Sequence, residues 1–279
     1  MSQTTGLSRM PDYDGRRSHN ALVAKLSRFA SLSDDDVDVL EALCSKQERV
    51  EAGMNLVDEG SAPRRGFVIT RGLACRYRGL PNGNRQILAF LIPGDFYDLH
   101  AFLLSVADHS VATMVPTRLA RIERDKVFEI VEHHPRIGAA LWWSAMQEAA
   151  MLRERIVMLG RRNALARIAY LFCELLWRHR AIGLTDDHTL PLPLTQADIA
   201  DTLGLTAVHV NRVLQDLRRE GLITLAHRRL TIHHVGRLQG LAQLNQDFLH
   251  LTGVPAEVER YLERLVQQEA DPRRIASSC

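Results

Sequence analysis

Gly204 separates two short amphipathic segments, and each segment begins with a helix-capping residue. Thr195 precedes the first segment and Asp198 follows three residues later, which is the spacing of a capping box. Thr206 precedes the second segment, and a glycine at position 204 permits the left-handed backbone of a tight turn between helices. The apolar positions that can form one shared core are Ile199, Leu203, Leu205, Val210 and Val213. This spacing predicts a helix-turn-helix unit.

The second of these helices presents polar and basic side chains on the side away from that core. A recognition helix directs its N-terminal side chains to base edges in the DNA major groove, where Arg212 can bind guanine through two hydrogen bonds. A hairpin over 222–232 follows, with His227, Arg228 and Arg229 at a tip suited to phosphate. The residues predicted to contact DNA are Thr206, Val208, His209, Asn211, Arg212, Gln215, Arg218, Arg228 and Arg229. The competing interpretation, a helical hairpin with a solvated basic face, is weaker because the turn glycine, core spacing and following hairpin agree.

A different periodicity holds over about residues 48–124, where short apolar runs alternate with turn signals. Asn82 and Gly83 lie between two such runs and form the strongest hairpin signal in the chain. Strands that recur every 8–12 residues with such turns are typical of a small antiparallel sandwich or roll. Upstream, Ser33 precedes three aspartates and marks the start of a helix. The predicted fold class is α+β: an N-terminal antiparallel β-roll of the jelly-roll kind, a long dimerisation helix and a C-terminal winged helix-turn-helix.

The long helix is predicted over about residues 136–159. Its apolar side chains recur in alternating steps of four and three, which fits the seam of a two-stranded coiled coil. The residues predicted at a dimer interface are Trp142, Ala145, Ala149, Leu152, Ile156 and Leu159. The same pattern also fits a helix that packs on its own β-roll, so both arrangements stay open.

The sequence predicts five consecutive segments. They are a disordered N-terminal arm (1–19), a β-roll sensor-like domain with flanking helices (20–134), a dimerisation helix (135–160), a winged helix-turn-helix domain (161–235) and a helical C-terminal extension (236–279). In the extension, Leu238, Leu241, Leu244 and Phe248 predict one amphipathic helix, and a second follows Pro255. We expect the extension to pack against the winged domain rather than to form a separate partner-binding module.

The overall composition limits the classes of function that the protein can have. The formal net charge is only +2, so any DNA affinity must come from a local concentration of arginines. We expect no signal peptide, because no apolar run follows Arg16 and Arg17 near the N-terminus. No apolar run reaches membrane-spanning length, and the four cysteines have no paired spacing. We therefore expect a cytoplasmic protein with no membrane association, no disulfide framework and no metal site.

The order of these parts resembles the Crp/Fnr family of bacterial transcription regulators over about residues 20–235. The motifs that carry the resemblance are DEG (58–60), IPGDF (92–96), RIA (167–169) and LTQADIADTLGLTAVHVNRVLQDLRREGLI (194–223). The resemblance implies a regulator without enzymatic activity, an activator that binds a pseudo-palindromic site on double-stranded DNA as a homodimer and works with RNA polymerase. It also implies that Arg212 takes the place of the family's guanine-reading arginine, whereas Val208 replaces a glutamate that many members carry one helical turn earlier.

The effector pocket that the resemblance implies departs from the family pattern. In the cyclic-nucleotide-binding members a Gly-Glu pair holds the ribose and an Arg-Ser pair holds the cyclic phosphate. Here Asp98-Leu99 and His109-Ser110 stand at those positions, and the polar long-helix residues that meet adenine are replaced around Leu152 and Arg153. Loss of the arginine removes a bidentate phosphate clamp, which argues against cyclic AMP. A regulator controlled by its own abundance, without a ligand, is a further alternative.

The sequence gives little support for sensing through an iron–sulfur cluster, a metal ion or haem. The oxygen-sensing members bind an iron–sulfur cluster through cysteines near the N-terminus, and here the first cysteine is Cys44. His100 and His109 leave open a metal- or haem-responsive sensor, or a cupin-like enzyme whose β-roll is the principal site. No His-x-His pattern joins them, and histidines in a roll are more often hydrogen-bonded structure. No cofactor is predicted.

Overall fold

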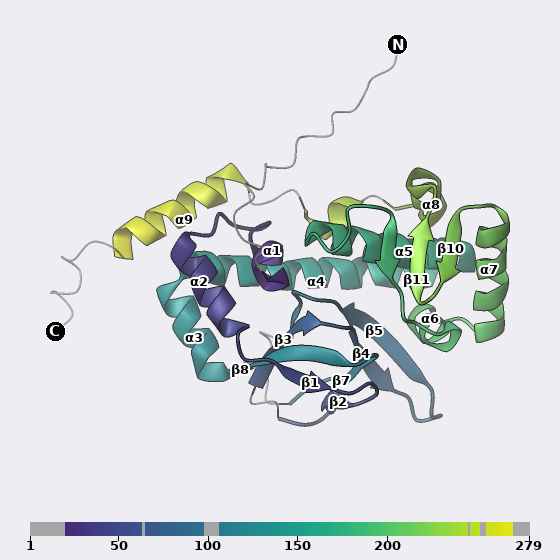
Figure 1. Ribbon diagram of the computed structural model, residues 1–279, viewed down its shortest axis with the longest axis horizontal. Coiled ribbons are helices and arrows are strands. Elements are labelled where there is room, and N and C mark those ends of the chain that lie inside the picture. Colours follow the sequence, from purple (N-terminus) through teal and green to yellow (C-terminus); the bar gives the residue numbers. More distant parts are fainter. Residues whose placement is uncertain (1–19, 63–64, 98–105, 245, 252–254, 270–279) are drawn as a thin grey trace, which may run out of the picture.

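The computed structural model describes residues 20–62, 65–97, 106–244, 246–251 and 255–269 (Figure 1). The helices are α1 (Ala21–Leu26), α2 (Asp34–Leu43), α3 (Arg124–His133), α4 (Pro135–Arg161), α5 (Ala164–Ala181), α6 (Gln196–Leu203), α7 (Ala207–Arg219), α8 (Val235–Ala242) and α9 (Ala256–Glu269), with a 3₁₀ turn at Gln246–Leu249. The strands are β1 (Glu48–Val50), β2 (Asn55–Val57), β3 (Arg65–Arg71), β4 (Ala74–Gly79), β5 (Arg85–Leu91), β6 (Phe96–Tyr97), β7 (Ser110–Thr113), β8 (Thr117–Glu123), β9 (Thr189–Pro191), β10 (Ile223–Ala226) and β11 (Arg229–Ile232). The predicted arm over 1–19, the pocket residues Asp98 and Leu99, the candidate ligand His100 and the end of the extension lie outside the described residues.

The described strands of the β-roll form two antiparallel sheets, ordered β1-β8-β3-β6 and β2-β7-β4-β5. Phe67, Tyr97 and Leu119 are fully buried in the core of the roll, because alternate side chains of a strand point to the same face. The β4–β5 hairpin turns at Asn82-Gly83, where Gly83 has a φ of 82°. Together with α4 and the C-terminal unit, this confirms the predicted α+β class.

The N-terminal helices pack beside the roll (Figure 1). Ser33 caps α2 as predicted, and Asp36 completes a capping box by accepting a hydrogen bond from the Ser33 backbone N–H at 2.9 Å. A second apolar cluster joins α1 and α2 to the N-terminal half of α4 through Leu22, Leu40 and Ile137.

Helix α4 has one side buried within the protomer and another side exposed to solvent. One side is buried against the rest of the protomer through Ile137, Ala140, Leu141, Ser144, Gln147, Ala150, Met151, Arg155 and Met158. The large apolar side chains of α4 that stay exposed are Trp142, Met146, Leu152, Ile156 and Val157. The sequence left open whether α4 packs on its own β-roll or on a second copy of itself. These two arrangements do not exclude each other, because packing on the protomer leaves an apolar stripe of α4 exposed.

The C-terminal unit is built around α5, whose side chains are almost all buried. Helix α8 packs on α5, and a sheet ordered β10-β11-β9 forms the wing. Strand β9 was not predicted, because Pro191 and Pro193 are typical of irregular backbone. It forms at the edge of the sheet, with Leu190 fully buried opposite Leu230.

The C-terminal extension differs from its predicted course. The continuous helix through Leu244 and Phe248 was wrong, because α8 ends at Ala242 and Gln243 takes a left-handed conformation with a φ of 51°. The chain then crosses to α4, where the Leu249 carbonyl oxygen accepts a hydrogen bond from Gln147. The extension therefore packs on the winged domain through α8 but on the long helix through its 3₁₀ turn.

The cysteines within the described residues are free and buried: Cys44, Cys75 and Cys173. Burial raises the pKa of the Cys44 thiol to about 12 and that of the Cys173 thiol to about 12. These thiols therefore stay protonated near neutral pH and are poor nucleophiles.

Candidate nucleic-acid interface

The helix-turn-helix forms through the local contacts that its sequence encodes. The Thr195 hydroxyl accepts a hydrogen bond from the Asp198 backbone N–H at 3.1 Å, and the Asp198 carboxylate accepts one from the Thr195 backbone N–H at 2.8 Å. Gly204 ends α6 with a φ of 61°, and the Thr206 hydroxyl accepts a hydrogen bond from the His209 backbone N–H at 3.2 Å. These caps fix where each helix begins and hence which side chains of α7 face outward.

The outward face of α7 is free of protein cover. Val208 is 82% exposed, and Asn211, Arg212 and Gln215 are exposed, whereas His209 is half-buried. On the opposite face, Val210, Val213, Leu214 and Leu217 are buried against the rest of the unit. Thr206 is exposed at the start of α7, and Arg218 near its end is half-buried.

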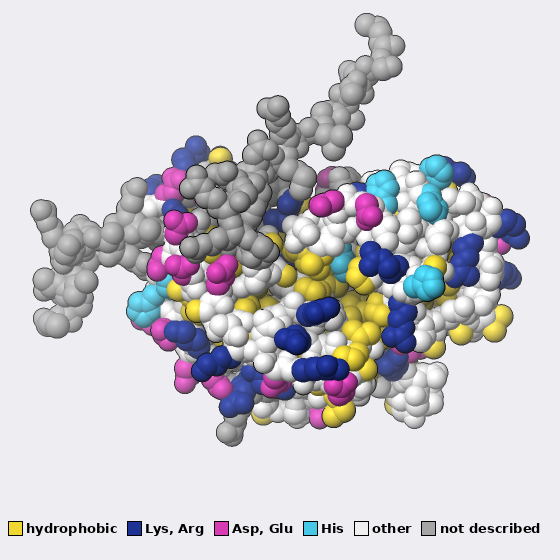
Figure 2. All heavy atoms as spheres, in the orientation of Figure 1, with side chains coloured by type: hydrophobic (Ala, Val, Ile, Leu, Met, Phe, Trp, Pro, Cys, Tyr) yellow, Lys and Arg dark blue, Asp and Glu magenta, His cyan; other side chains and the backbone are white. Residues whose placement is uncertain are grey.

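The wing carries the other predicted basic contacts. His227 and Arg228 form the turn between β10 and β11, with φ values of 50° and 57°, as a tight two-residue hairpin turn requires. Arg228 and Arg229 are both exposed. Figure 2 shows Lys, Arg and His side chains over the right-hand part of the molecule, where this unit lies, and further Lys and Arg side chains over the centre and the lower left. Asp and Glu side chains lie mainly over the left-hand part around α2 and α3. The exposed basic side chains of the winged unit suit contact with a polyanion.

Two contacts around this unit were missed by sequence reasoning. Arg85 at the start of β5 forms ion pairs with Asp198 at 2.6 Å and with Asp201 at 2.8 Å, which ties the β4–β5 hairpin to α6. The Gln196 side-chain carbonyl accepts a hydrogen bond from Asn211 Nδ2 at 3.1 Å, which joins the first turn of α6 to the outward face of α7. Gln196 directly follows the Thr195 cap, and this position in the first turn of α6 was the one sequence signal for its contact with α7. Nothing in the sequence pairs Arg85 with α6.

Aromatic and charged side chains meet in the described part of the β-roll interior. The rings of Phe67 and Tyr97 stack with centroids 4.7 Å apart, and the Arg76 guanidinium lies 5.4 Å from the Tyr97 ring centroid. Arg76 also forms an ion pair with Glu148 of α4 at 2.9 Å, and both side chains are mostly buried.

The described residues of the predicted effector pocket do not all face this interior. His109 lies beside the Tyr97 ring, with centroids 5.9 Å apart, and its Nδ1 is 2.6 Å from the Asp108 carboxylate. The Ser110 hydroxyl accepts a hydrogen bond from the Glu59 backbone N–H at 2.9 Å. Leu152 and Arg153 are exposed on α4 of the protomer. The described part of the chain contains no group of three or more His, Cys, Asp or Glu side chains placed to hold a metal ion.

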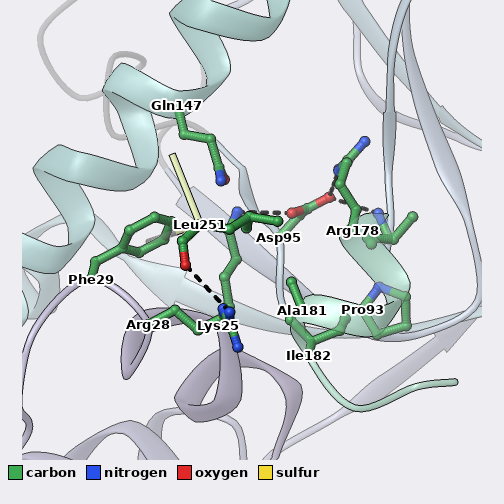
Figure 3. Close-up of a pocket in the computed structure, with 11 residues that line it drawn as sticks. Lys25, Arg28, Phe29, Pro93, Asp95, Gln147, Arg178, Ala181, Ile182 and Leu251 are labelled. Atoms are coloured by element: carbon green, nitrogen blue, oxygen red, sulfur yellow. Dashed lines mark hydrogen bonds and ion pairs between the residues drawn. The ribbon is translucent and has the colours of Figure 1, made fainter. Parts of the chain in front are cut away.

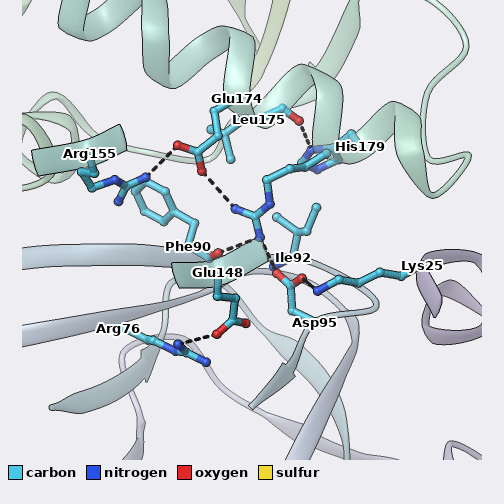
Figure 4. Close-up of polar contacts among 11 residues, drawn as sticks. Lys25, Arg76, Phe90, Ile92, Asp95, Glu148, Arg155, Glu174, Leu175 and His179 are labelled. Carbon is cyan, nitrogen blue, oxygen red and sulfur yellow. Dashed lines mark hydrogen bonds and ion pairs between the residues drawn. The ribbon is translucent and has the colours of Figure 1, made fainter. Parts of the chain in front are cut away.

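A buried charge network connects the roll to the C-terminal unit (Figure 4). Asp95, in the turn before β6, forms ion pairs with Lys25 of α1 at 2.8 Å and with Arg178 of α5 at 2.5 Å. Arg178 also contacts Glu174 at 3.3 Å, and Glu174 forms an ion pair with Arg155 of α4 at 2.9 Å. Burial alone raises the pKa of Asp95, but the charges of Lys25 and Arg178 outweigh it and hold that pKa below its ordinary value.

The edge of this network borders a small pocket (Figure 3). Its lining includes Lys25, Phe29, Gln147 and Arg178, together with Leu251 from the C-terminal extension. The Leu251 carbonyl oxygen accepts a hydrogen bond from Arg28 at 3.3 Å. The extension thus contributes one wall of the pocket where α1, α4 and α5 meet.

Comparisons with known proteins match both halves of the chain. The Crp-like helix-turn-helix domain matches residues 166–241, and the cyclic nucleotide-binding domain matches residues 47–134. The nitrogen fixation regulation protein FixK of Bradyrhizobium diazoefficiens is 30% identical over 177 residues, which cover 63% of this chain and 73% of that protein. The transcriptional activator protein FnrL of Cereibacter sphaeroides is 28% identical over 185 residues, 65% of this chain and 74% of that protein.

Solved structures agree on the fold. The structure of FixK2 from Bradyrhizobium japonicum superposes with a TM-score of 0.65 at 23% identity, covering 72% of this chain and 98% of that one. A CooA mutant from Carboxydothermus hydrogenoformans gives a TM-score of 0.59 at 19% identity, covering 81% and 97%. Within the described residues, no helix combines the length and apolar character needed to span a bilayer. Matches to both domains and to FixK show that the chain belongs to the Crp/Fnr family of DNA-binding transcription regulators and is not an enzyme.

Proposed function

We propose that this protein binds a pseudo-palindromic operator as a homodimer and activates transcription together with RNA polymerase. Helix α7 of each protomer enters the major groove of one half-site, and the half-sites lie about one DNA turn apart. The observation that carries this proposal is the uncovered outward face of α7, with Val208, Asn211 and Arg212 exposed. The activator role is supported by the relative FnrL, whose name describes a transcriptional activator. The proposed action on the bacterial chromosome also implies that this protein lies in the cytoplasm.

The dimer is supported by the apolar stripe on α4. Trp142, Leu152 and Ile156 are large apolar side chains that the protomer leaves exposed. Ala145, Ala149 and Leu159, which complete the predicted interface, are half-buried. Water-exposed apolar patches of this kind are typical of protein interfaces, and the heptad-like spacing fits a second copy of α4 better than an unrelated partner.

The half-site is expected to contain a guanine for Arg212. Arginine presents two parallel N–H donors that match the O6 and N7 acceptors of guanine. Val208 has no hydrogen-bonding group and can only contact a thymine methyl or exclude other groups. We therefore expect the guanine to be retained and the base pair next to it to depart from the preference of members that carry glutamate there.

A random-pool binding selection at a stated salt concentration tests the proposed function as a whole. It should return two half-sites in inverted orientation, because a two-fold symmetric dimer presents two equivalent helices. Salt must be fixed, since phosphate contacts make the affinity strongly salt-dependent. Recovery of no enriched sequence would refute the proposed function.

Replacing Arg212 by alanine should remove the preference for one guanine and weaken binding to the selected site by about 1–3 kcal/mol. Fluorescence anisotropy on duplexes that differ only at that base pair measures the change. Arg228→Ala is the matched control, because loss of a phosphate contact should weaken binding to all sequences alike. An Arg212→Ala protein that keeps the wild-type ranking of the four base pairs would demote Arg212 to a phosphate contact.

Cyclic AMP should leave both operator affinity and thermal stability unchanged. The arginine that holds the cyclic phosphate in the family pattern is replaced by His109, and in the described part of the roll Arg76 is paired with Glu148 instead. A ligand that binds only the folded state raises the unfolding temperature, so thermal unfolding with and without millimolar cyclic AMP is a direct measurement. A concentration-dependent rise in Tm would contradict the expectation.

A further inference from the structure

The hydrogen bond between Gln196 and Asn211 joins the two helices on the side that faces away from their shared core. Gln196 is the first residue of α6, directly after the Thr195 cap, and its side chain is half-buried. Asn211 lies on α7 between the exposed Val208 and Gln215 and precedes Arg212. Asn211 Nδ2 donates to Gln196 Oε1 at 3.1 Å.

This contact leaves a defined set of hydrogen-bonding groups on Asn211. A carboxamide carries two N–H donors and one carbonyl acceptor. One N–H is used by Gln196, so the second N–H and Oδ1 remain available to a further partner. An exposed asparagine without such a partner can rotate its amide and exchange the two positions, and fixing one orientation lowers the entropic penalty of binding.

The remaining donor and acceptor match one base in the major groove. Adenine presents the N7 acceptor next to the N6 amino donor, which pairs with an N–H and a carbonyl oxygen in that order. Guanine presents two acceptors, so the Asn211 carbonyl would face another acceptor there. Thymine presents an acceptor and a methyl group, and cytosine presents a donor.

We propose that Gln196 is a positioning residue that holds Asn211 to read an adenine in the same half-site as the guanine read by Arg212. The inference rests on the proposed DNA-binding function and deepens it by naming a second base and the residue that orients its reader. Gln196 acts through Asn211 and does not touch the base.

The test measures base preference rather than affinity alone. Duplexes carrying each of the four base pairs at the selected adenine position are titrated with the wild type, Asn211→Ala, Gln196→Ala and the double variant. The wild type should prefer adenine by about tenfold, and Asn211→Ala should abolish that preference while keeping the preference for guanine at the Arg212 position. Gln196→Ala should reduce the adenine preference to about threefold, and adding it to Asn211→Ala should change the preference no further, because the two residues act as one unit.

Gln196→Glu provides the matched control. A glutamate keeps the acceptor for Asn211 Nδ2, so the adenine preference should persist, while the added negative charge near phosphates lowers affinity for all sequences. A Gln196→Ala protein that loses affinity equally for all four duplexes would overturn the inference and assign Gln196 a phosphate contact. Wild-type protein that selects the guanine without any adenine preference also refutes the inference and leaves the proposed function standing. A wild type that selects no sequence at all refutes the proposed function itself.

Discussion

Replacing Arg178 by methionine should lower the free energy of unfolding by about 3 kcal/mol, because removing one partner of a buried ion pair leaves the other charge poorly compensated. Arg178 is buried and lies between two buried carboxylates, at 2.5 Å from Asp95 and 3.3 Å from Glu174. It also donates to the Phe90 carbonyl oxygen at 3.1 Å. Methionine has a similar length and fills most of the space, so the loss reports charge and hydrogen bonding more than a cavity. Each carboxylate keeps one cation, Lys25 or Arg155, which limits the loss.

Urea unfolding followed by circular dichroism measures this change, with wild type and variant at the same protein concentration because the proposed dimerisation would contribute to stability. The matched control is Arg65→Met, which breaks the surface ion pair with Glu123. Those two side chains lie 2.7 Å apart but are 57% and 61% exposed. Solvent screens such a pair, so its loss should change the free energy of unfolding by less than about 1 kcal/mol. Equal small losses in the two variants would show that the buried network is not a major source of stability.

The same network affects how the free energy of unfolding changes at acid pH. Burial raises the pKa of Glu174, but Arg155 and Arg178 outweigh it, so the pKa values of both Glu174 and Asp95 lie below their ordinary range. A carboxyl group whose pKa is lower in the folded state than in the unfolded state stabilises the fold above its unfolded pKa, at about pH 4. That stabilisation is lost as the pH falls through the lowered pKa values. The Arg178→Met protein should therefore show a shallower loss of stability below about pH 4 than the wild type.

The double variant Leu152→Arg with Ile156→Arg should be monomeric and should bind the full operator at least about 100-fold more weakly than the wild type. Two linked recognition helices bind two half-sites with a high effective concentration, and a monomer loses that advantage without losing any contact to its own half-site. Leu152 is 44% and Ile156 is 71% exposed in the protomer, so charges at these positions do not disturb its core. Repulsion between arginines of the two copies opposes association instead.

Analytical ultracentrifugation measures the oligomeric state, and anisotropy compares a full operator with a single half-site. Met54→Arg is the matched control, because Met54 is an apolar residue of the roll that is 53% exposed and lies away from α4. It should remain dimeric and bind as the wild type does. The double variant and the wild type should bind an isolated half-site similarly. Full operator affinity in a monomeric double variant would refute the dimer proposal.

The sequence determined those features that depend on neighbouring residues. Thr195, Gly204 and Thr206 predict the helix-turn-helix because caps and a left-handed turn are encoded within a few residues. Asn82 and Gly83 predict the β4–β5 hairpin for the same reason. The resulting exposure of Arg212 on α7 follows from helical periodicity alone.

Contacts between distant segments were decided only by the tertiary structure. Asp95 meets Lys25 and Arg178 across separations of 70 and 83 residues, and Arg85 meets Asp198 across 113. A charged residue in a sequence has many candidate partners, and burial that excludes water decides which of them pair. The break in the extension at Gln243 has a similar origin, because burial of Leu244 and the hydrogen bonds that Gln147 and Arg28 donate to the following carbonyls outweigh the local helical pattern. Local chemistry therefore determined the DNA-reading helix, and long-range packing decided how that helix is attached to the rest of the protein.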